Sequence, residues 1–401
     1  MKKLLGYIPE IGVVDQSTPI RHIPEPVALT RDGITVTIDK VVLDTVRTTV
    51  KFHVEGIPSS AYPQHLPGSD HQGFQKPCDD TLYLRLPDGT LVERDGYNAI
   101  SGHVEVTTYW ASFTLAPVPA EFDQATLVMP CILGVEQGIA PENWEFALLF
   151  EPGDEEMIVP VHELQTAAAE PGTTSTSTST ETAKDPGSLP SLGISFILDK
   201  WVPLPDGDVL YGRMEWDENT LYSAVTPDTY VLTDSQGQQL QIEQVSPDPA
   251  SMPVPGNRYV PVAFKIMSPV ENPGPLTLTI TSVSANLYDK STQFTFDTGP
   301  NPEVGQEWTL DKDIRFGEFS FQIRSAVRAS DGYDFFFQPS DGLQCADIVL
   351  PGSTLVGGGC WPDHTSVKFD ANPPSGVLSV WVSNLAIQLN GSWQETWEPQ
   401  K

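Results

Sequence analysis

The chain has 401 residues, 39% of them hydrophobic, and its 22 basic and 53 acidic residues give a formal net charge of −31. A surface this acidic argues against nucleic acid and anionic lipid as partners, because both are bound through cationic contacts. The 37 prolines, the 31 glycines and the lack of long helical patterns indicate short strands joined by many turns.

The N-terminal residues MKKLL look like the start of a secretory signal, but Gly6-Tyr7-Ile8-Pro9-Glu10 ends the apolar stretch at once. We therefore expect no signal peptide within the chain. No run of about 18 apolar residues occurs either, so no membrane-spanning segment is expected. Two alternatives stay open: a targeting segment that precedes Met1, or a cytoplasmic protein.

Apolar and polar residues alternate with a period of two in the first part of the chain. Residues 35–38 (TVTI) and 49–54 (TVKFHV) follow this pattern, which is typical of half-buried strands. Asp88-Gly89 separates two further alternating runs and predicts a tight hairpin. Asp206-Gly207 and Ser235-Gln236-Gly237 are expected to form similar turns in the second half.

The chain also repeats itself. GITVTIDK at 33–40 recurs as GISFILDK at 193–200, and each copy is followed by a second alternating run. A strand-turn segment, a Pro-rich break and a closing strand then follow in the same order in three units. The closing strands are expected at 144–153, 291–300 and 392–399. Units of this kind predict an all-β chain of tandem immunoglobulin-like β-sandwich domains, although chance similarity between generic strand-turn patterns is the alternative.

The composition divides the chain at AAAEPGTTSTSTSTETAKDPGS (167–188), which lacks large apolar residues and predicts an extended linker. The expected organisation is one sandwich with its N-terminal segment over 1–165, the Ser/Thr-rich linker over 166–190, and sandwiches over 191–302 and 303–401. Most aromatic residues lie in alternating runs and are expected in the cores: Trp110, Phe113, Phe146, Phe150, Phe196, Phe264, Phe294, Phe296, Phe321, Phe335 and Trp381.

The four cysteines are Cys78, Cys131, Cys345 and Cys360, and none belongs to a Cys-x-x-Cys pair. The spacing of a zinc site is therefore missing. Because the first two lie in one repeat unit and the last two in another, they predict two local disulfides in an oxidising compartment. Four buried free thiols are the alternative.

The sequence contains no recognisable catalytic motif, and we expect no catalytic residue, no cofactor and no bound metal. Gly-x-Ser-x-Gly is absent, and no acidic group follows the order of an EF-hand. One loop combines potential metal ligands at spacings that match no familiar zinc pattern: His65, His71, Cys78, Asp79 and Asp80. Calcium between domains stays open through acidic turns at Asp154-Glu155-Glu156, Asp206/Asp208, Asp217/Glu218 and Asp311/Asp313.

The N-terminal part resembles a bacterial family. LLGYIPEIGVVDQS at 4–17, the strand region up to residue 56, LYLRLPDGT and PENWEFALLF follow one another as in the exported domain of unknown function of anti-sigma-factor-like membrane proteins. The resemblance covers residues 4–165 well and 190–300 more loosely. It implies that residues 4–17 are juxtamembrane. It also implies that a sigma-binding region and a membrane helix come before this domain.

These observations predict a non-enzymatic module at the cell surface, the extracytoplasmic sensory or interaction part of an anti-sigma-like regulator. Its partner would be a protein or a small extracellular ligand, and the membrane would be reached only through an N-terminal anchor outside the chain. The alternative is a structural stalk, adhesin or filament component, for which self-assembly is expected. An enzyme such as a carbohydrate-active hydrolase is a third hypothesis, because fold does not decide function.

Overall fold

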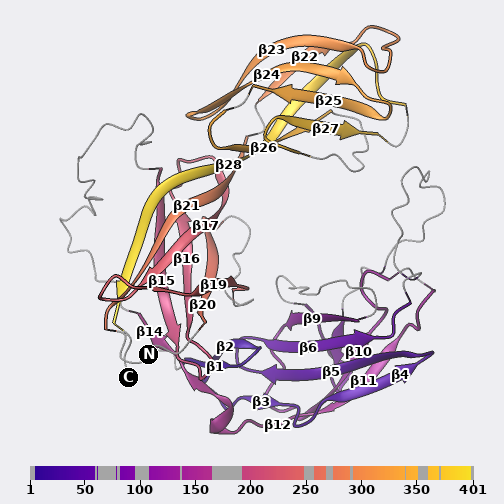
Figure 1. Ribbon diagram of the computed structural model, residues 1–401. Coiled ribbons are helices and arrows are strands. Elements are labelled where there is room, and N and C mark those ends of the chain that lie inside the picture. Colours follow the sequence, from indigo (N-terminus) through magenta and orange to yellow (C-terminus); the bar gives the residue numbers. More distant parts are fainter. Residues whose placement is uncertain are drawn as a thin grey trace. The chain divides into compact units, whose positions relative to one another are not determined.

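We analysed a computed structural model of the chain (Figure 1). It describes residues 5–58, 61, 78, 82–94, 108–135, 138–164, 192–247, 257–267, 274–289, 292–338, 340–350, 360–369 and 372–398. These residues form antiparallel sheets with no α-helix among them, apart from a 3-10 turn at Glu155–Met157. The predicted all-β class is confirmed, whereas immunoglobulin-like topology stays a prediction. In the described ranges no helix has the length and apolarity to span a membrane.

The chain divides into two compact units. The first comprises Met1–Glu163, Lys200–Val209 and Ser246–Val254, and the second comprises Leu164–Asp199, Leu210–Val245 and Pro255–Lys401.

The first unit contains two facing sheets. One has the order β12-β3-β5-β6-β9, with β4 also pairing with β5, and the other has the order β11-β10-β7-β8. Their strands are β3 (Arg21–His22), β4 (Val27–Arg31), β5 (Ile34–Leu43), β6 (Thr48–Glu55), β7 (Tyr83–Arg85), β8 (Leu91–Val92), β9 (Thr108–Leu115), β10 (Gln124–Met129), β11 (Trp144–Leu149) and β12 (Glu151–Pro152).

The core of this sandwich follows from the alternation of its strands. Successive side chains point to opposite faces, so every second residue of β6 and β11 is buried between the sheets. Phe52 stacks on Phe113 with ring centroids 5.7 Å apart, and Trp144 stacks on Phe146 at 6.5 Å. The Asp88-Gly89 hairpin joins β7 to β8 as predicted, with Gly89 at φ +89°.

The N-terminal segment folds onto this sandwich as a hairpin. β1 (Leu5–Ile8) pairs with β2 (Gly12–Asp15) and with β13 (Val159–Pro160). Its apolar side chains form a second, smaller core with the sandwich: Ile8, Ile11, Val14, Ile20 and Val42. The guanidinium of Arg47 donates to the carbonyl of Val13 at 2.5 Å, and Lys51 pairs with Glu10 at 3.0 Å.

The second unit holds two sandwiches. In the first, β15 (Ile194–Val202), β16 (Val209–Trp216), β20 (Tyr259–Ile266) and β19 (Ile242–Val245) form one sheet, in this order. Its end pairs with β14 (His162–Glu163) through Trp201 and Lys200, which belong to the first unit. The facing sheet contains β18 (Gln239–Leu240), β17 (Tyr222–Thr233), β21 (Leu276–Tyr288) and part of β28 (Val377–Trp397).

The other sandwich of this unit faces the rest of β28, with its neighbours β22 (Gln293–Asp297) and β26 (Leu343–Val349), against a four-stranded sheet. That sheet has the order β23 (Glu307–Phe316), β24 (Phe319–Arg328), β25 (Gly332–Phe337) and β27 (His364–Lys368). Phe296 packs edge-on against Tyr333 and Phe335, with ring centroids 6.2 and 6.0 Å away. Such T-shaped pairs are favoured by the ring quadrupoles.

β28 belongs to both sandwiches (Figure 1). Val377–Trp381 pair with β22, whereas Asn384–Trp397 pair with β21. A strand of 21 residues extends about 70 Å, more than a sheet of one small domain needs. The pairing therefore runs across the boundary expected at residue 302, and the strands expected to close their own units at 291–300 and 392–399 each pair in the neighbouring sandwich.

The repeated octapeptides occupy equivalent places. They open β5 and β15, and the aspartate of each copy contacts a basic residue on the following strand. Asp39 accepts a 2.9 Å hydrogen bond from His53 Nδ1, and Asp199 pairs with Arg213. Both pairs are separated by 14 residues in the sequence, as expected for a duplicated strand pair.

Candidate functional site

A cavity of about 260 Å³ lies in the second unit, where the ends of β16, β17 and β21 meet the hairpin between β23 and β24. Asp217, Glu318 and Tyr222 supply its ionisable groups, and Asn219 and Thr220 add neutral polar ones. The apolar part of the wall consists of Leu192, Leu221, Leu287, Phe316 and Phe319. A concave site with apolar walls and a few convergent polar groups is the usual form of a small-molecule site, and its volume is just below the range, from about 300 Å³ upwards, of such pockets.

The tight turn of the β23–β24 hairpin holds Glu318 at the cavity. Phe316 pairs directly with Phe319, which leaves Gly317 and Glu318 as the two turn residues. Gly317 has φ +57° while Glu318 has a negative φ, the pattern of a type II′ turn, which favours glycine at its first position. A Cβ atom at Gly317 would lie 3.6 Å from Leu221 Cδ1, so the turn packs against the cavity wall.

Asp217 is placed by the turn that follows β16. Its backbone N–H donates to the carbonyl of Gly193 at 2.9 Å, and its carbonyl accepts the hydroxyl of Thr220 at 2.7 Å. Gly193 has φ +63°, and a Cβ atom there would lie 2.7 Å from Asp217 Oδ2. Glycine is favoured at this position, because any other residue would be strained at this φ and its Cβ atom would displace the carboxylate.

Tyr222 is the buried polar residue of the cavity. The residue as a whole is 8% exposed. Its hydroxyl makes no hydrogen bond with any residue that the structure describes, and the hydroxyl oxygen itself is not fully buried. Burial, and secondarily the negative charge of Glu318, raise the pKa of Tyr222 to about 12. The hydroxyl oxygen is therefore open to the cavity, where a ligand can form a hydrogen bond with it.

Neither carboxylate of the cavity is neutralised by a described basic side chain. No ion pair joins Asp217 or Glu318 to a Lys, Arg or His within the described ranges. The nearby guanidinium of Arg258 donates instead to the backbone carbonyl of Asp217 at 3.0 Å. The residues that line the cavity therefore include two carboxylates and no basic side chain.

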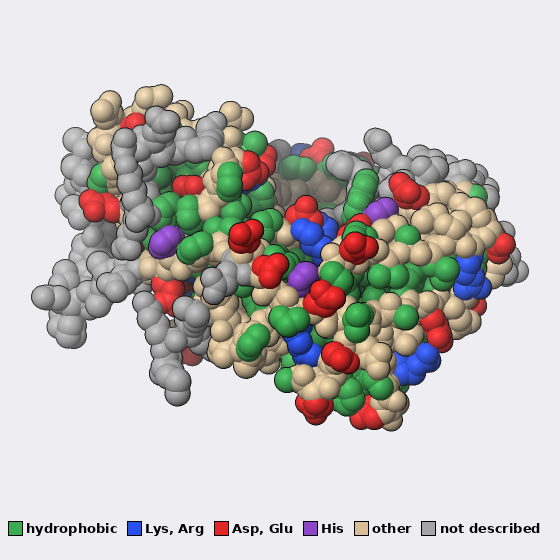
Figure 2. All heavy atoms as spheres, turned by 90° about the horizontal axis from the view of Figure 1, so that it is seen from below, with side chains coloured by type: hydrophobic (Ala, Val, Ile, Leu, Met, Phe, Trp, Pro, Cys, Tyr) green, Lys and Arg blue, Asp and Glu red, His purple; other side chains and the backbone are tan. Residues whose placement is uncertain are grey.

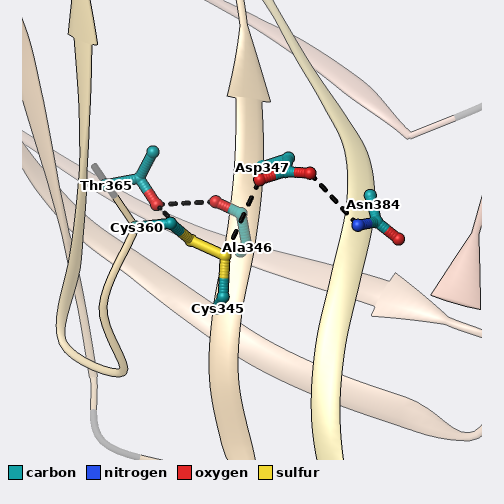
Figure 3. The surroundings of a disulfide bond; sticks show 6 residues. All are labelled: Cys345, Ala346, Asp347, Cys360, Thr365 and Asn384. Atoms are coloured by element: carbon teal, nitrogen blue, oxygen red, sulfur yellow. Dashed lines mark hydrogen bonds between the residues drawn. A yellow bond between two sulfur atoms is a disulfide. The ribbon is translucent and has the colours of Figure 1, made fainter. Parts of the chain in front are cut away.

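The disulfide between Cys345 and Cys360 links β26 to the segment that precedes β27, where Cys360 forms an isolated bridge with Thr365 (Figure 3). The carboxylate of Asp347 lies 3.6 Å from Cys345 Sγ and accepts a hydrogen bond from Asn384 Nδ2 at 3.1 Å. These two sulfurs and this carboxylate are close enough to hold a metal ion. Because metal ligation requires thiolates, the disulfide makes the sulfurs unavailable as ligands.

The second disulfide joins Cys78 to Cys131 in the first unit, and both side chains are buried. Backbone hydrogen bonds fix Cys78, which donates to Val135 at 2.8 Å and accepts from Gly134 at 3.0 Å. The predicted local pairing of all four cysteines is thus present. The other potential ligands of the same loop, His65, His71, Asp79 and Asp80, lie outside the described residues.

The acidic turns singled out from the sequence form no further cluster. Among the described residues, three ligand atoms at metal-binding spacing occur only in the group with Cys345 and Cys360. Acidic side chains are instead scattered over the visible surface, with fewer basic ones between them (Figure 2). Such dispersed charge favours solubility.

Two of the aromatic residues expected in the cores are on the surface. Trp110 is 46% exposed and Trp381 is 42% exposed, so the core prediction is wrong for both. Another exposed aromatic, Trp361, stacks on His364 with ring centroids 4.4 Å apart. The sequence interpretation also missed Tyr222 and Glu318, although Phe-Gly-Glu-Phe between two alternating runs is a recognisable hairpin signal.

No protein-family model and no curated protein matches the chain. Among solved structures, the chain is similar to one described as the crystal structure of the conserved domain protein from Bacillus anthracis. The identity is 13% and the TM-score 0.32, over 69% of this chain and 81% of that chain. No family is assigned from this similarity.

Proposed function

We propose that the chain is a non-enzymatic interaction module that works outside the cytoplasm, as the sensory part of an anti-sigma-like regulator. The observation that carries this proposal is the pairing of all four cysteines, Cys78 with Cys131 and Cys345 with Cys360. Disulfides persist in oxidising compartments and are rare in the reducing cytosol. The acidic, solvated surface and the cavity of the second unit support a binding role at the cell exterior.

The regulator part of the proposal is supported by the N-terminal residues. LLGYIPEIGVVDQS carries the resemblance to anti-sigma-factor-like membrane proteins, and this segment packs on the first sandwich through Ile8, Ile11 and Val14. A signal that changed the stability of this small core would alter the segment through which a membrane anchor is expected to connect.

The test is to locate the protein in intact cells of its native host. A membrane-impermeant biotinylation reagent, applied before lysis, is expected to label the chain, while a cytoplasmic control protein stays unlabelled. Labelling that occurs only after lysis would contradict the proposal. Mass spectrometry of the protein from the same preparation measures how long the native chain is. It shows whether a sigma-binding region and a membrane helix precede Met1.

The structural alternative, a surface stalk or filament component, is favoured by one observation. β28 pairs in both sandwiches, so a single strand connects them, and such a continuous connection suits a spacer. Sedimentation at increasing protein concentration separates the two hypotheses. A constant monomer supports the regulator, and concentration-dependent growth of long assemblies supports the structural role.

A further inference from the structure

We propose that the cavity of the second unit binds a small organic cation through an alkylammonium group. The inference rests on the proposed binding role and names the class of ligand. It is carried by two carboxylates without an ion-pair partner among the described residues, a tyrosine hydroxyl that is open to the cavity, and apolar wall residues, all lining one cavity.

The two carboxylates of the cavity favour a positively charged ligand. Asp217 and Glu318 line the cavity, and no ion pair with a described basic residue compensates either of them. An anion would be repelled by both carboxylates. An ammonium group offers three N–H donors, which match two carboxylates and the oxygen of Tyr222. The Tyr222 hydroxyl accepts one of these hydrogen bonds and thereby gains a partner that none of the described residues provides.

The apolar residues of the cavity wall favour a ligand that carries an alkyl chain. Leu221, Leu287 and Phe319 line the cavity beside the carboxylates, and Leu287 is buried. An alkyl chain of a few carbons covers these side chains and gains about 0.8 kcal/mol for each CH₂ that it buries. The ring of Tyr222, which also lines the wall, adds a π face to which an ammonium group is attracted.

A divalent metal ion fits the same residues less well. Calcium is held by six to eight oxygen ligands, whereas five of the twelve lining residues are leucine or phenylalanine, whose side chains supply none. The acidic residue that follows Asp217, Glu218, is not part of the lining. The observations therefore favour an organic cation over calcium, and the experiment below distinguishes the two.

The experiment titrates the full chain, labelled at its leucine methyl groups, with pentylammonium chloride and with 1-pentanol, its neutral counterpart. Leu192, Leu221 and Leu287 line the cavity and act as reporters. Saturable shifts of these methyl signals are expected with pentylammonium, with at least tenfold weaker binding of the alcohol. Affinity is expected to fall as NaCl is raised, because salt screens the two carboxylates.

Three variants test the residues. Glu318→Gln is expected to weaken pentylammonium binding about tenfold, and Tyr222→Phe at least threefold. Glu307→Gln provides the matched control, because Glu307 is an exposed residue at the far end of the same hairpin and is expected to leave the affinity unchanged. Glu318 is itself exposed, so its substitution does not endanger folding.

The proposal is overturned if 1-pentanol binds as tightly as pentylammonium, if Glu318→Gln binds with the affinity of the unmodified chain, or if no saturable shifts occur. Calcium chloride that shifts the same leucine signals, when pentylammonium does not, would establish a metal site in its place. Labelling of the chain on intact cells is a separate measurement. A protein that is exported but does not bind pentylammonium would contradict this inference and leave the proposed function standing.

Discussion

The substitution Trp397→Ala tests most directly whether the end of β28 pairs with β21. Trp397 ends β28, pairs with Leu276 of β21 and is 7% exposed. Burial of about 200 Å² of indole surface stabilises the folded state by about 5 kcal/mol. The indole N–H has no hydrogen-bond partner in the described structure, and its desolvation offsets part of this gain, so we expect a net loss of about 3 kcal/mol.

The strands that lose hydrogen-exchange protection in this variant distinguish the observed pairing of β28 from the domain boundary that the sequence predicts at residue 302. If residues 384–397 complete the sheet of β17 and β21, hydrogen exchange of Trp397→Ala must speed up in residues 222–233 and 276–288. Mass spectrometry of peptides from the native protein measures this directly, and urea unfolding supplies the free energy of unfolding. Faster exchange in β23–β25 with unchanged protection of β17 and β21 would refute the reasoning.

Trp381→Ala on the same strand is the matched control. Trp381 has the same side chain, but it is 42% exposed and pairs with Gln293 of β22. Substitutions of such surface residues change stability by about 0.5 kcal/mol or less. A loss as large as that of Trp397→Ala would mean that the burial pattern along β28 is not the one described.

Three further outcomes are expected. Replacing both Cys345 and Cys360 by serine opens a loop with a sequence separation of 15. By the loop-entropy model, this should lower the free energy of unfolding, measured with urea, by about 3 kcal/mol. An unchanged urea midpoint would contradict this prediction. Since the pKa of Tyr222 is raised from 10.0 to about 12, its stabilising contribution is present below pH 10 and lost as the pH rises towards 12. Between pH 9 and pH 11.5 the unmodified chain should therefore lose about 1.8 kcal/mol more of its free energy of unfolding than Tyr222→Phe does. Equal losses for the two proteins in urea unfolding at these two pH values would exclude the shift. Gly193→Ala should lower the free energy of unfolding by about 1–2 kcal/mol, because alanine is strained at this positive φ. It should also displace the Asp217 carboxylate and thereby weaken pentylammonium binding in the methyl titration. Unchanged affinity would contradict the placement of Asp217.

Local features of the fold were predictable because they depend on neighbouring residues. Alternation with period two placed β5 and β6, and Asp88-Gly89 placed the β7–β8 hairpin, since turn chemistry acts within a few residues. The same rule identifies the error at Trp110. Residues three apart on a strand point to opposite faces, so Trp110 and Phe113 cannot both be buried in the core.

The pairing of β28 was not predictable in this way. Alternation determines which face of a strand is buried, but it does not determine which strand lies beside it. Neighbouring strands in the sequence pair in only about two-thirds of cases, and here Gln293–Asp297 and the end of β28 each pair outside the expected unit. The cavity depends on the same long-range pairing, because Tyr222 and Glu318 are far apart in the sequence. Tyr222, taken alone, is one more aromatic residue in an alternating run.

The central claim, that this is a module of an oxidising extracytoplasmic compartment, is tested most directly by the state of its cysteines in the native host. Cells are quenched in acid, free thiols are alkylated, and the digested protein is analysed by mass spectrometry. The account predicts two disulfide-linked peptide pairs, one with Cys78 and Cys131 and one with Cys345 and Cys360, and no alkylated cysteine. Four alkylated thiols in freshly quenched cells would contradict it.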